Sequence, residues 1–153
     1  MSNDALLNIE RFLPHRAPIR LIDRLINADD EHVVVEAQVP THGRFVRDGV
    51  MPAWVSIEYM AQAIAAWAGA RAVRRGDVPQ IGLLLGTRKL ELHRADIPCG
   101  ALLSIRAHCE LETDNGLGMF ACHMMLGDEV VARANLSVYE PEDSANYLAR
   151  ASS

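Results

Sequence analysis

The chain has few cysteines, few aromatic residues and no concentrated block of positive charge. Its cysteines are Cys99, Cys109 and Cys122, an odd number with no Cys-x-x-Cys pair among them. This usage argues against a disulfide framework or a cysteine-ligated metal site, and it predicts a cytoplasmic protein. Acidic residues outnumber basic residues by 20 to 15. Because nucleic-acid binding requires clustered cations, we expect no nucleic-acid partner.

Internal repeats, low-complexity segments and a signal-peptide pattern are also missing from the sequence. The chain has 153 residues, half of them hydrophobic. That length and composition are sufficient for one domain with a substantial core. We expect this domain to span residues 1–140 and a C-terminal tail to span residues 141–153.

The most apolar stretch, Met51–Ala70, contains a single carboxylate, Glu58, and one further strongly polar side chain, Gln62. Twenty apolar residues can cross a bilayer, but an unpaired carboxylate within them is costly there. We therefore expect a core helix of a soluble domain and no membrane span. Since a buried charge is also costly in a protein core, Glu58 is exposed, paired from another segment or kept for chemistry.

The order of apolar patterns predicts an α+β domain with one antiparallel sheet. A β-branched run ends at Pro40, and Pro52 is a natural start for a long helix that reaches about Val73. The Asn-Gly pair at 115–116 predicts a tight hairpin between two later strands. A helix that is apolar nearly all round must be covered, so we expect a curved sheet wrapped around it. The expected elements are a short helix at 5–12, strands at 19–26, 31–40, 81–93, 101–112, 119–127 and 129–140, and the helix at 54–73.

Two blocks of sequence carry a family resemblance. The segments FLPHRAPIRLIDRL (12–25) and VMPAWVSIEYMAQA (50–63) resemble the hotdog-fold 3-hydroxyacyl carrier-protein dehydratases of the FabZ and FabA type. The opening Leu-Pro-His-x-Ala-Pro, the Pro-x-Trp before the helix and LLLGTRKLEL (83–92) are more similar to the ApeP-type dehydratases of aryl polyene biosynthesis. The resemblance implies a hotdog fold and the conversion of 3-hydroxyacyl to trans-2-enoyl chains. It also implies a substrate held on the phosphopantetheine of an acyl carrier protein.

The resemblance further implies that Glu58 is the catalytic acid or base. FabZ-type enzymes place a catalytic histidine fourteen residues before this carboxylate, but here that position holds Arg44. The nearest imidazole in the sequence is His42, and His15 in the opening block is the other candidate. The identity of the histidine partner stays open at this point.

Substrate-binding roles are expected around the start of the helix. Its first amides and its dipole favour a thioester oxygen, which points to Pro52, Ala53 and Trp54. Gln62, one turn after the carboxylate, is placed to hold the carboxylate or the substrate. Arg44 is a candidate for the phosphopantetheine phosphate or for an acidic carrier protein.

Two alternatives to a self-sufficient dehydratase remain. A hotdog acyl thioesterase would use Glu58 to activate water and needs no histidine at position 44. A non-catalytic subunit would instead complete a heterodimeric dehydratase whose histidine comes from another chain. A homodimer and a heterodimer with another hotdog subunit are both compatible with the sequence. No metal centre is expected from ligand spacing, and no cofactor is expected because LLLGTR lacks a glycine-rich phosphate loop.

Overall fold

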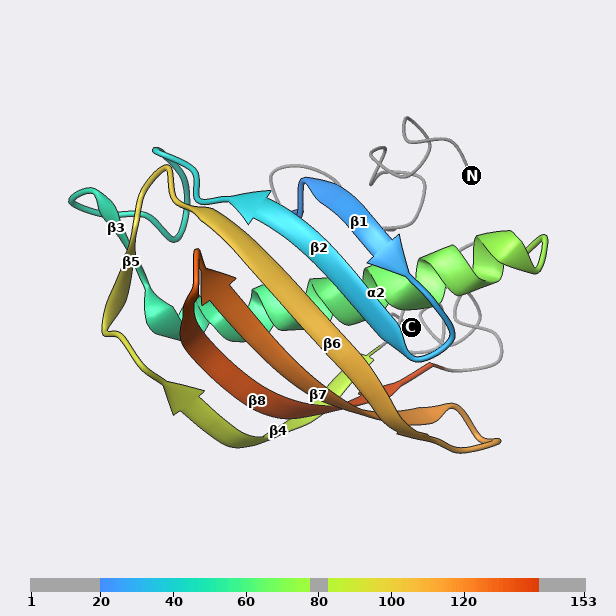
Figure 1. The fold of residues 1–153 in the computed structure, drawn as a ribbon. Helices are drawn as coiled ribbons and strands as arrows, with labels where there is room; N and C mark the ends of the chain where they lie inside the picture. The colour runs from blue at the N-terminus through green and yellow to red at the C-terminus, as the bar shows by residue number, and fades with distance from the viewer. Residues whose placement is uncertain (1–19, 78–82, 141–153) are drawn as a thin grey trace, which may run out of the picture.

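A computed structural model describes residues 20–77 and 83–140 of the chain. One antiparallel sheet of six strands curves around a single long helix, as Figure 1 shows. This arrangement confirms the predicted α+β fold with a sheet wrapped around a central helix. The strands of this sheet are β1 (Arg24–Ala28), β2 (His32–Gln38), β4 (Leu83–Leu92), β6 (Leu102–Glu112), β7 (Leu117–Leu126) and β8 (Glu129–Tyr139).

The strand order in the sheet is β1-β2-β6-β7-β8-β4. Strand β4 follows the helix in sequence and lies at the far edge, paired with β8. The hairpin between β6 and β7 turns at the predicted Asn-Gly position, and Thr113 N donates to Leu117 O at 2.8 Å to close it. A second sheet, of β3 (Val50–Pro52) and β5 (Asp96–Pro98), was not expected. Each of its strands has only three residues and ends in proline, so neither has a recognisable alternating pattern.

The long helix begins as a 3₁₀ turn, Ala53–Val55, and continues as α2, Ser56–Arg74. It therefore lies within one or two residues of the predicted helix, with Pro52 directly before its first turn. Trp67 packs edge-on against Phe120 with ring centroids 5.3 Å apart, and its Nε1 donates to Asp29 O at 2.9 Å. Each fully buried large apolar side chain stabilises the fold by about 1.5–3 kcal/mol. The largest buried side chains along α2 and the six-stranded sheet are Leu25, Tyr59, Met60, Trp67, Leu103, Ile105 and Met124.

One side of α2 is less covered than the sequence pattern predicted. Glu58, Ala61, Ala65 and Ala68 recur at helical spacing and are each only half-buried among the described residues. All four line a cavity between α2 and the sheet. The sheet thus encloses most of the helix, and a stripe of small side chains with one carboxylate faces open space.

Two expectations fall outside the described residues: the short helix at 5–12 and the tail at 141–153. Strand β1 begins later than the expected strand at 19–26, and the N–H of Leu21 donates to the Gln62 side chain rather than to a neighbouring strand. Within β1 the register with β2 shifts between Leu25 and Asn27. Within residues 20–77 and 83–140, no helix combines the length and the apolar character needed to cross a membrane.

The tight turn between β6 and β7 generates a stability prediction. Gly116 has a φ of +93°, and a Cβ added there would collide with the carbonyl oxygen of Glu140. We expect Gly116→Ala to lower the free energy of unfolding by about 2–4 kcal/mol, measured by urea denaturation.

Gly127 is the matched control, because its φ is +60° and a Cβ there meets nothing within 4 Å. Gly127→Ala should cost only the left-handed backbone strain, about 1–2 kcal/mol. Equal losses in the two variants would contradict a steric role for the Glu140 carbonyl.

Candidate active site

Glu58 lies in the first turn of α2, where two cavities meet. The loop cavity, about 800 Å³, is formed by the segment from Pro40 to Phe45 together with the start of α2. The helix cavity, about 180 Å³, runs along the half-covered stripe of α2 toward Arg71. Glu58 contributes to the walls of both cavities. A molecule that extends from one cavity into the other would therefore pass this carboxylate.

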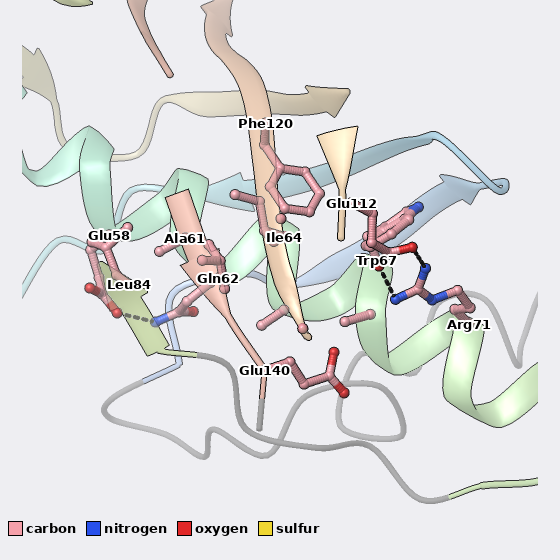
Figure 2. Close-up of a pocket in the computed structure, with 15 residues that line it drawn as sticks. Glu58, Ala61, Gln62, Ile64, Trp67, Arg71, Leu84, Glu112, Phe120 and Glu140 are labelled. Carbon is pink, nitrogen blue, oxygen red and sulfur yellow. Dashed lines mark hydrogen bonds and ion pairs between the residues drawn. The ribbon is translucent and has the colours of Figure 1, made fainter. Parts of the chain in front are cut away.

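Gln62 holds the carboxylate in place, which is one of the two roles, carboxylate or substrate contact, that the sequence spacing left open. Its side chain is fully buried, and its Nε2 donates to Glu58 Oε1 at 3.2 Å. Its Oε1 accepts a hydrogen bond of 2.7 Å from Leu21 N in the segment before β1. Because the backbone N–H of Leu21 must donate to the oxygen, the amide nitrogen is the end that faces Glu58. Figure 2 shows this pair at one end of the helix cavity.

The loop cavity brings together several residues that the sequence singled out. His42 and Arg44 are both exposed, and both line this cavity with Glu58. Trp54, 56% exposed, also lines it and meets Phe45 edge-on with ring centroids 6.0 Å apart. The structure therefore places the nearer of the two histidine candidates in the same cavity as the carboxylate. The other candidate, His15, lies outside the described residues.

The start of the helix offers fewer amides than the sequence suggested. Pro52 has no N–H, and Ala53 N already donates to Ala95 O at 3.1 Å. Ala53 is also buried, and its carbonyl accepts a hydrogen bond of 2.5 Å from the Ser56 hydroxyl. These two residues shape the entry of the helix, so amide donors for a ligand in the loop cavity must come from Trp54 onward.

The far end of the helix cavity is charged. Arg71 donates two hydrogen bonds to the Glu112 carboxylate, at 2.7 and 2.6 Å, and lies 4.2 Å from the Trp67 ring centroid. The Arg71 guanidinium lowers the pKa of Glu112, whereas burial raises the pKa of Glu140 on the same wall. Figure 2 shows these groups at the end opposite Glu58, with Ile64 and Phe120 between. The helix cavity thus has apolar walls and a polar end.

Tyr59 is a site residue that sequence reasoning missed. It lines the loop cavity, and among the described residues its buried hydroxyl has no hydrogen-bond partner. Burial raises the pKa of Tyr59 to about 12, and the charge of Asp23 acts in the same direction. The phenol is therefore a neutral donor at physiological pH. A tyrosine in an apolar helix is usually a packing residue of the hydrophobic core. Only the unpartnered hydroxyl indicates a further role for Tyr59, and that feature is not visible in the sequence.

Comparison with known proteins places this geometry in a family. The model of the ApeP-like family, described as ApeP dehydratase, matches residues 7–149. The 3-hydroxyacyl-[acyl-carrier-protein] dehydratase FabZ of Chlamydia trachomatis serovar L2 is 30% identical over 137 residues, 85% of this chain and 88% of that protein. A chain of the dehydratase heterocomplex ApeI:P from Xenorhabdus doucetiae matches with a TM-score of 0.83 at 30% identity. That match covers 92% of this chain and 95% of the other.

A more distant likeness concerns the fold alone. A hypothetical thioesterase from Streptococcus pneumoniae, solved with coenzyme A, has a TM-score of 0.60 at 14% identity, over 76% of this chain and 84% of its own. The two dehydratase matches, by contrast, combine 30% sequence identity with coverage of 85% and 92% of this chain. The resemblance predicted from segments 12–25 and 50–63 is confirmed, and this chain belongs to the ApeP-like dehydratase family.

Proposed function

We propose that this protein converts 3-hydroxyacyl chains on an acyl carrier protein to trans-2-enoyl chains, as one subunit of a two-chain hotdog dehydratase. The observation that carries the proposal is Glu58, held by Gln62 where the loop cavity and the helix cavity meet. Family membership supports the dehydratase chemistry, and the carrier-protein substrate is that of the FabZ relatives.

The reaction requires one base and one acid on either side of the substrate. The base takes the proton from C2, the acid protonates the departing C3 hydroxyl, and one molecule of water leaves. Glu58 performs one of these steps and a histidine performs the other. Elimination of water is redox-neutral, so the proposed acid–base reaction uses no electron-carrying cofactor. The three cysteines are unbridged, which supports our placing the reaction in the cytoplasm.

Each of the two cavities holds a different part of the substrate. The loop cavity, with the exposed Arg44 in its wall, receives the phosphopantetheine arm and its phosphate. The helix cavity, with apolar walls, receives the acyl chain. The thioester then lies beside Glu58, where the Tyr59 hydroxyl and the amides from Trp54 onward stabilise the developing negative charge on its oxygen.

A second hotdog subunit completes this site. Position 44 holds arginine, and His42 lies exposed in the loop cavity. Among the described residues, the carboxylate of Glu58 is hydrogen-bonded to Gln62, and no hydrogen bond or ion pair joins it to a histidine. Strand β4 is a ten-residue edge strand with exposed leucines, including Leu84 at 42% and Leu85 at 59%. A long apolar edge strand favours pairing with another sheet. The related chain from Xenorhabdus doucetiae was solved within a heterocomplex, which supports a heterodimer over a homodimer.

Loss of the carboxylate should abolish dehydration. Glu58→Gln keeps the size of the side chain and the contact with Gln62 but cannot exchange a proton. We expect the rate of 2-enoyl formation to fall by about 10²–10⁴-fold, measured by mass spectrometry of a 3-hydroxyacyl carrier protein with the subunit complex.

Glu110→Gln is the control, because Glu110 is an exposed carboxylate on β6 away from both cavities. Its rate should equal that of the wild type. Full activity in Glu58→Gln would contradict the proposed mechanism. Release of free acid by the wild type would instead indicate a thioesterase.

Loss of the phenol should affect the reaction without weakening the fold. Tyr59→Phe removes an unpartnered buried hydroxyl, so thermal unfolding should show equal or slightly higher stability. The turnover number should fall by about tenfold or more, because a donor to the thioester oxygen is lost. Tyr139→Phe on β8 is the matched control with unchanged turnover. A turnover number equal to that of the wild type in Tyr59→Phe would show that the hydroxyl has no role in the reaction.

A charge on the edge strand should weaken assembly. Leu85→Asp places a carboxylate on the exposed edge of β4, and we expect the dissociation constant of the subunit complex to rise at least about tenfold, measured by analytical ultracentrifugation. Leu111→Asp is the control, because Leu111 is 51% exposed but lies on an interior strand. Equal dissociation constants for the two variants would show that β4 is not the contact.

A further inference from the structure

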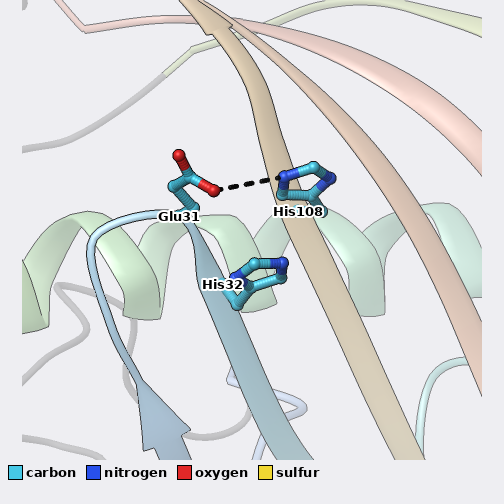
Figure 3. Close-up of side chains that lie close together, drawn as sticks. All are labelled: Glu31, His32 and His108. Carbon is cyan, nitrogen blue, oxygen red and sulfur yellow. Dashed lines mark ion pairs between the residues drawn. The ribbon is translucent and has the colours of Figure 1, made fainter.

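The sheet face opposite α2 carries a compact group of two imidazoles and one carboxylate. His32 begins β2 and lies directly opposite His108 of β6. Their neighbours Val33 and Ala107 are buried in the core, so the two histidines point to the outer face. Glu31 Oε2 lies 3.7 Å from His108 Nε2. Figure 3 shows the three side chains together in front of the strands, with the helix behind.

The strand register explains why the two rings meet. Cys109 N donates to Glu31 O at 2.7 Å, so the next pair, His32 and His108, is a non-hydrogen-bonded pair of the antiparallel ladder. Side chains of such pairs approach each other most closely. The rings stack with centroids 4.4 Å apart and planes 6° apart.

Asp29, in the turn before β2, contacts the ring of His32 and orients it. Its Oδ1 accepts hydrogen bonds from Glu31 N at 2.9 Å and His32 N at 2.7 Å, which fixes the carboxylate in the turn before β2. The same oxygen lies 3.3 Å from His32 Nδ1. When Nδ1 donates to Asp29, Nε2 of His32 carries the lone pair that binds a metal. Such a carboxylate behind a ligating imidazole is a recurring support of metal sites.

We propose that Glu31, His32 and His108 form a surface site for a divalent transition metal ion, with Zn²⁺ the ion that suits two nitrogens and one oxygen. One donor atom from each residue lies within 4.8 Å of the others. Donors around a tetrahedral zinc ion are about 3.4 Å apart, so small side-chain rotations close the site. The side chains are 68%, 55% and 44% exposed, which leaves the fourth position to water.

This inference revises the expectation of no metal centre. That expectation came from ligand spacing along the sequence, whereas the two histidines belong to strands far apart in the sequence. The site lies on the opposite face of the sheet from Glu58 and joins the start of β2 to β6. We therefore expect the metal to stabilise the sheet and to leave the rate of dehydration unchanged.

Titration of the full chain, without a histidine tag, with ZnCl₂ in a calorimeter tests the proposal. We expect one saturable site, and Tm should rise by about 5–10 °C at a free Zn²⁺ concentration about a hundredfold above Kd. His32→Ala and His108→Ala should each weaken binding at least about tenfold, and Asp29→Asn, a positioning variant, should weaken it about tenfold. His123→Ala is the control, because His123 lies on the outer face of neighbouring β7 and should leave the affinity unchanged.

Electron paramagnetic resonance of the Cu²⁺-loaded protein gives a readout of the ligands themselves. The wild type should show coupling to two imidazole nitrogens, and His108→Ala should show coupling to one. No saturable Zn²⁺ binding, equal affinity in the wild type and the His32 and His108 variants, or a Cu²⁺ spectrum unchanged by His108→Ala would each overturn the proposal.

Discussion

The hydrogen bonds of the buried Gln62 side chain connect the fold to the chemistry. One end of the amide holds the Glu58 carboxylate, and the other end accepts from the backbone of Leu21, outside the helix. A buried amide left without such partners would cost about 1–3 kcal/mol, so the packed core itself enforces this orientation. The carboxylate is consequently fixed at the junction of the two cavities. A substrate that reaches from the loop to the helix must then meet it in a defined position.

The packing of α2 leaves open the helix cavity that the Glu58 carboxylate lines. Large side chains such as Trp67 and Met60 anchor the helix against the curved sheet, while Ala61, Ala65 and Ala68 leave room on the remaining side. Replacing small residues along this stripe with large ones would fill the helix cavity. The same sheet ends in β4, an edge strand with exposed leucines, and this edge is where we propose that a second subunit pairs. The partly covered helix and the unpaired sheet edge are thus both parts of the proposed two-chain site.

Most of the fold was predictable from the sequence, because its signals are local. Pro52 marks the start of the helix, and Asn115-Gly116 marks the hairpin. Helical spacing put Gln62 within reach of Glu58 but left open whether it contacts the carboxylate or the substrate. The short sheet of β3 and β5, the unpartnered Tyr59 hydroxyl and the stacked His32 and His108 rings depend on contacts between distant segments. Neither spacing nor composition contains that information. The identity of the proposed histidine partner of Glu58 depends on such distant contacts too, so sequence spacing alone could not assign it.

The most direct test of the central claim is the reverse reaction in deuterium oxide. The subunit complex is incubated with a trans-2-enoyl carrier protein, and the acyl product is analysed by mass spectrometry. Hydration at the site should give a 3-hydroxyacyl chain with one non-exchangeable deuterium at C2, and Glu58→Gln should give none. Release of free acid without deuterium at C2, or equal deuterium incorporation by the wild type and Glu58→Gln, would contradict the assignment of Glu58 to dehydration.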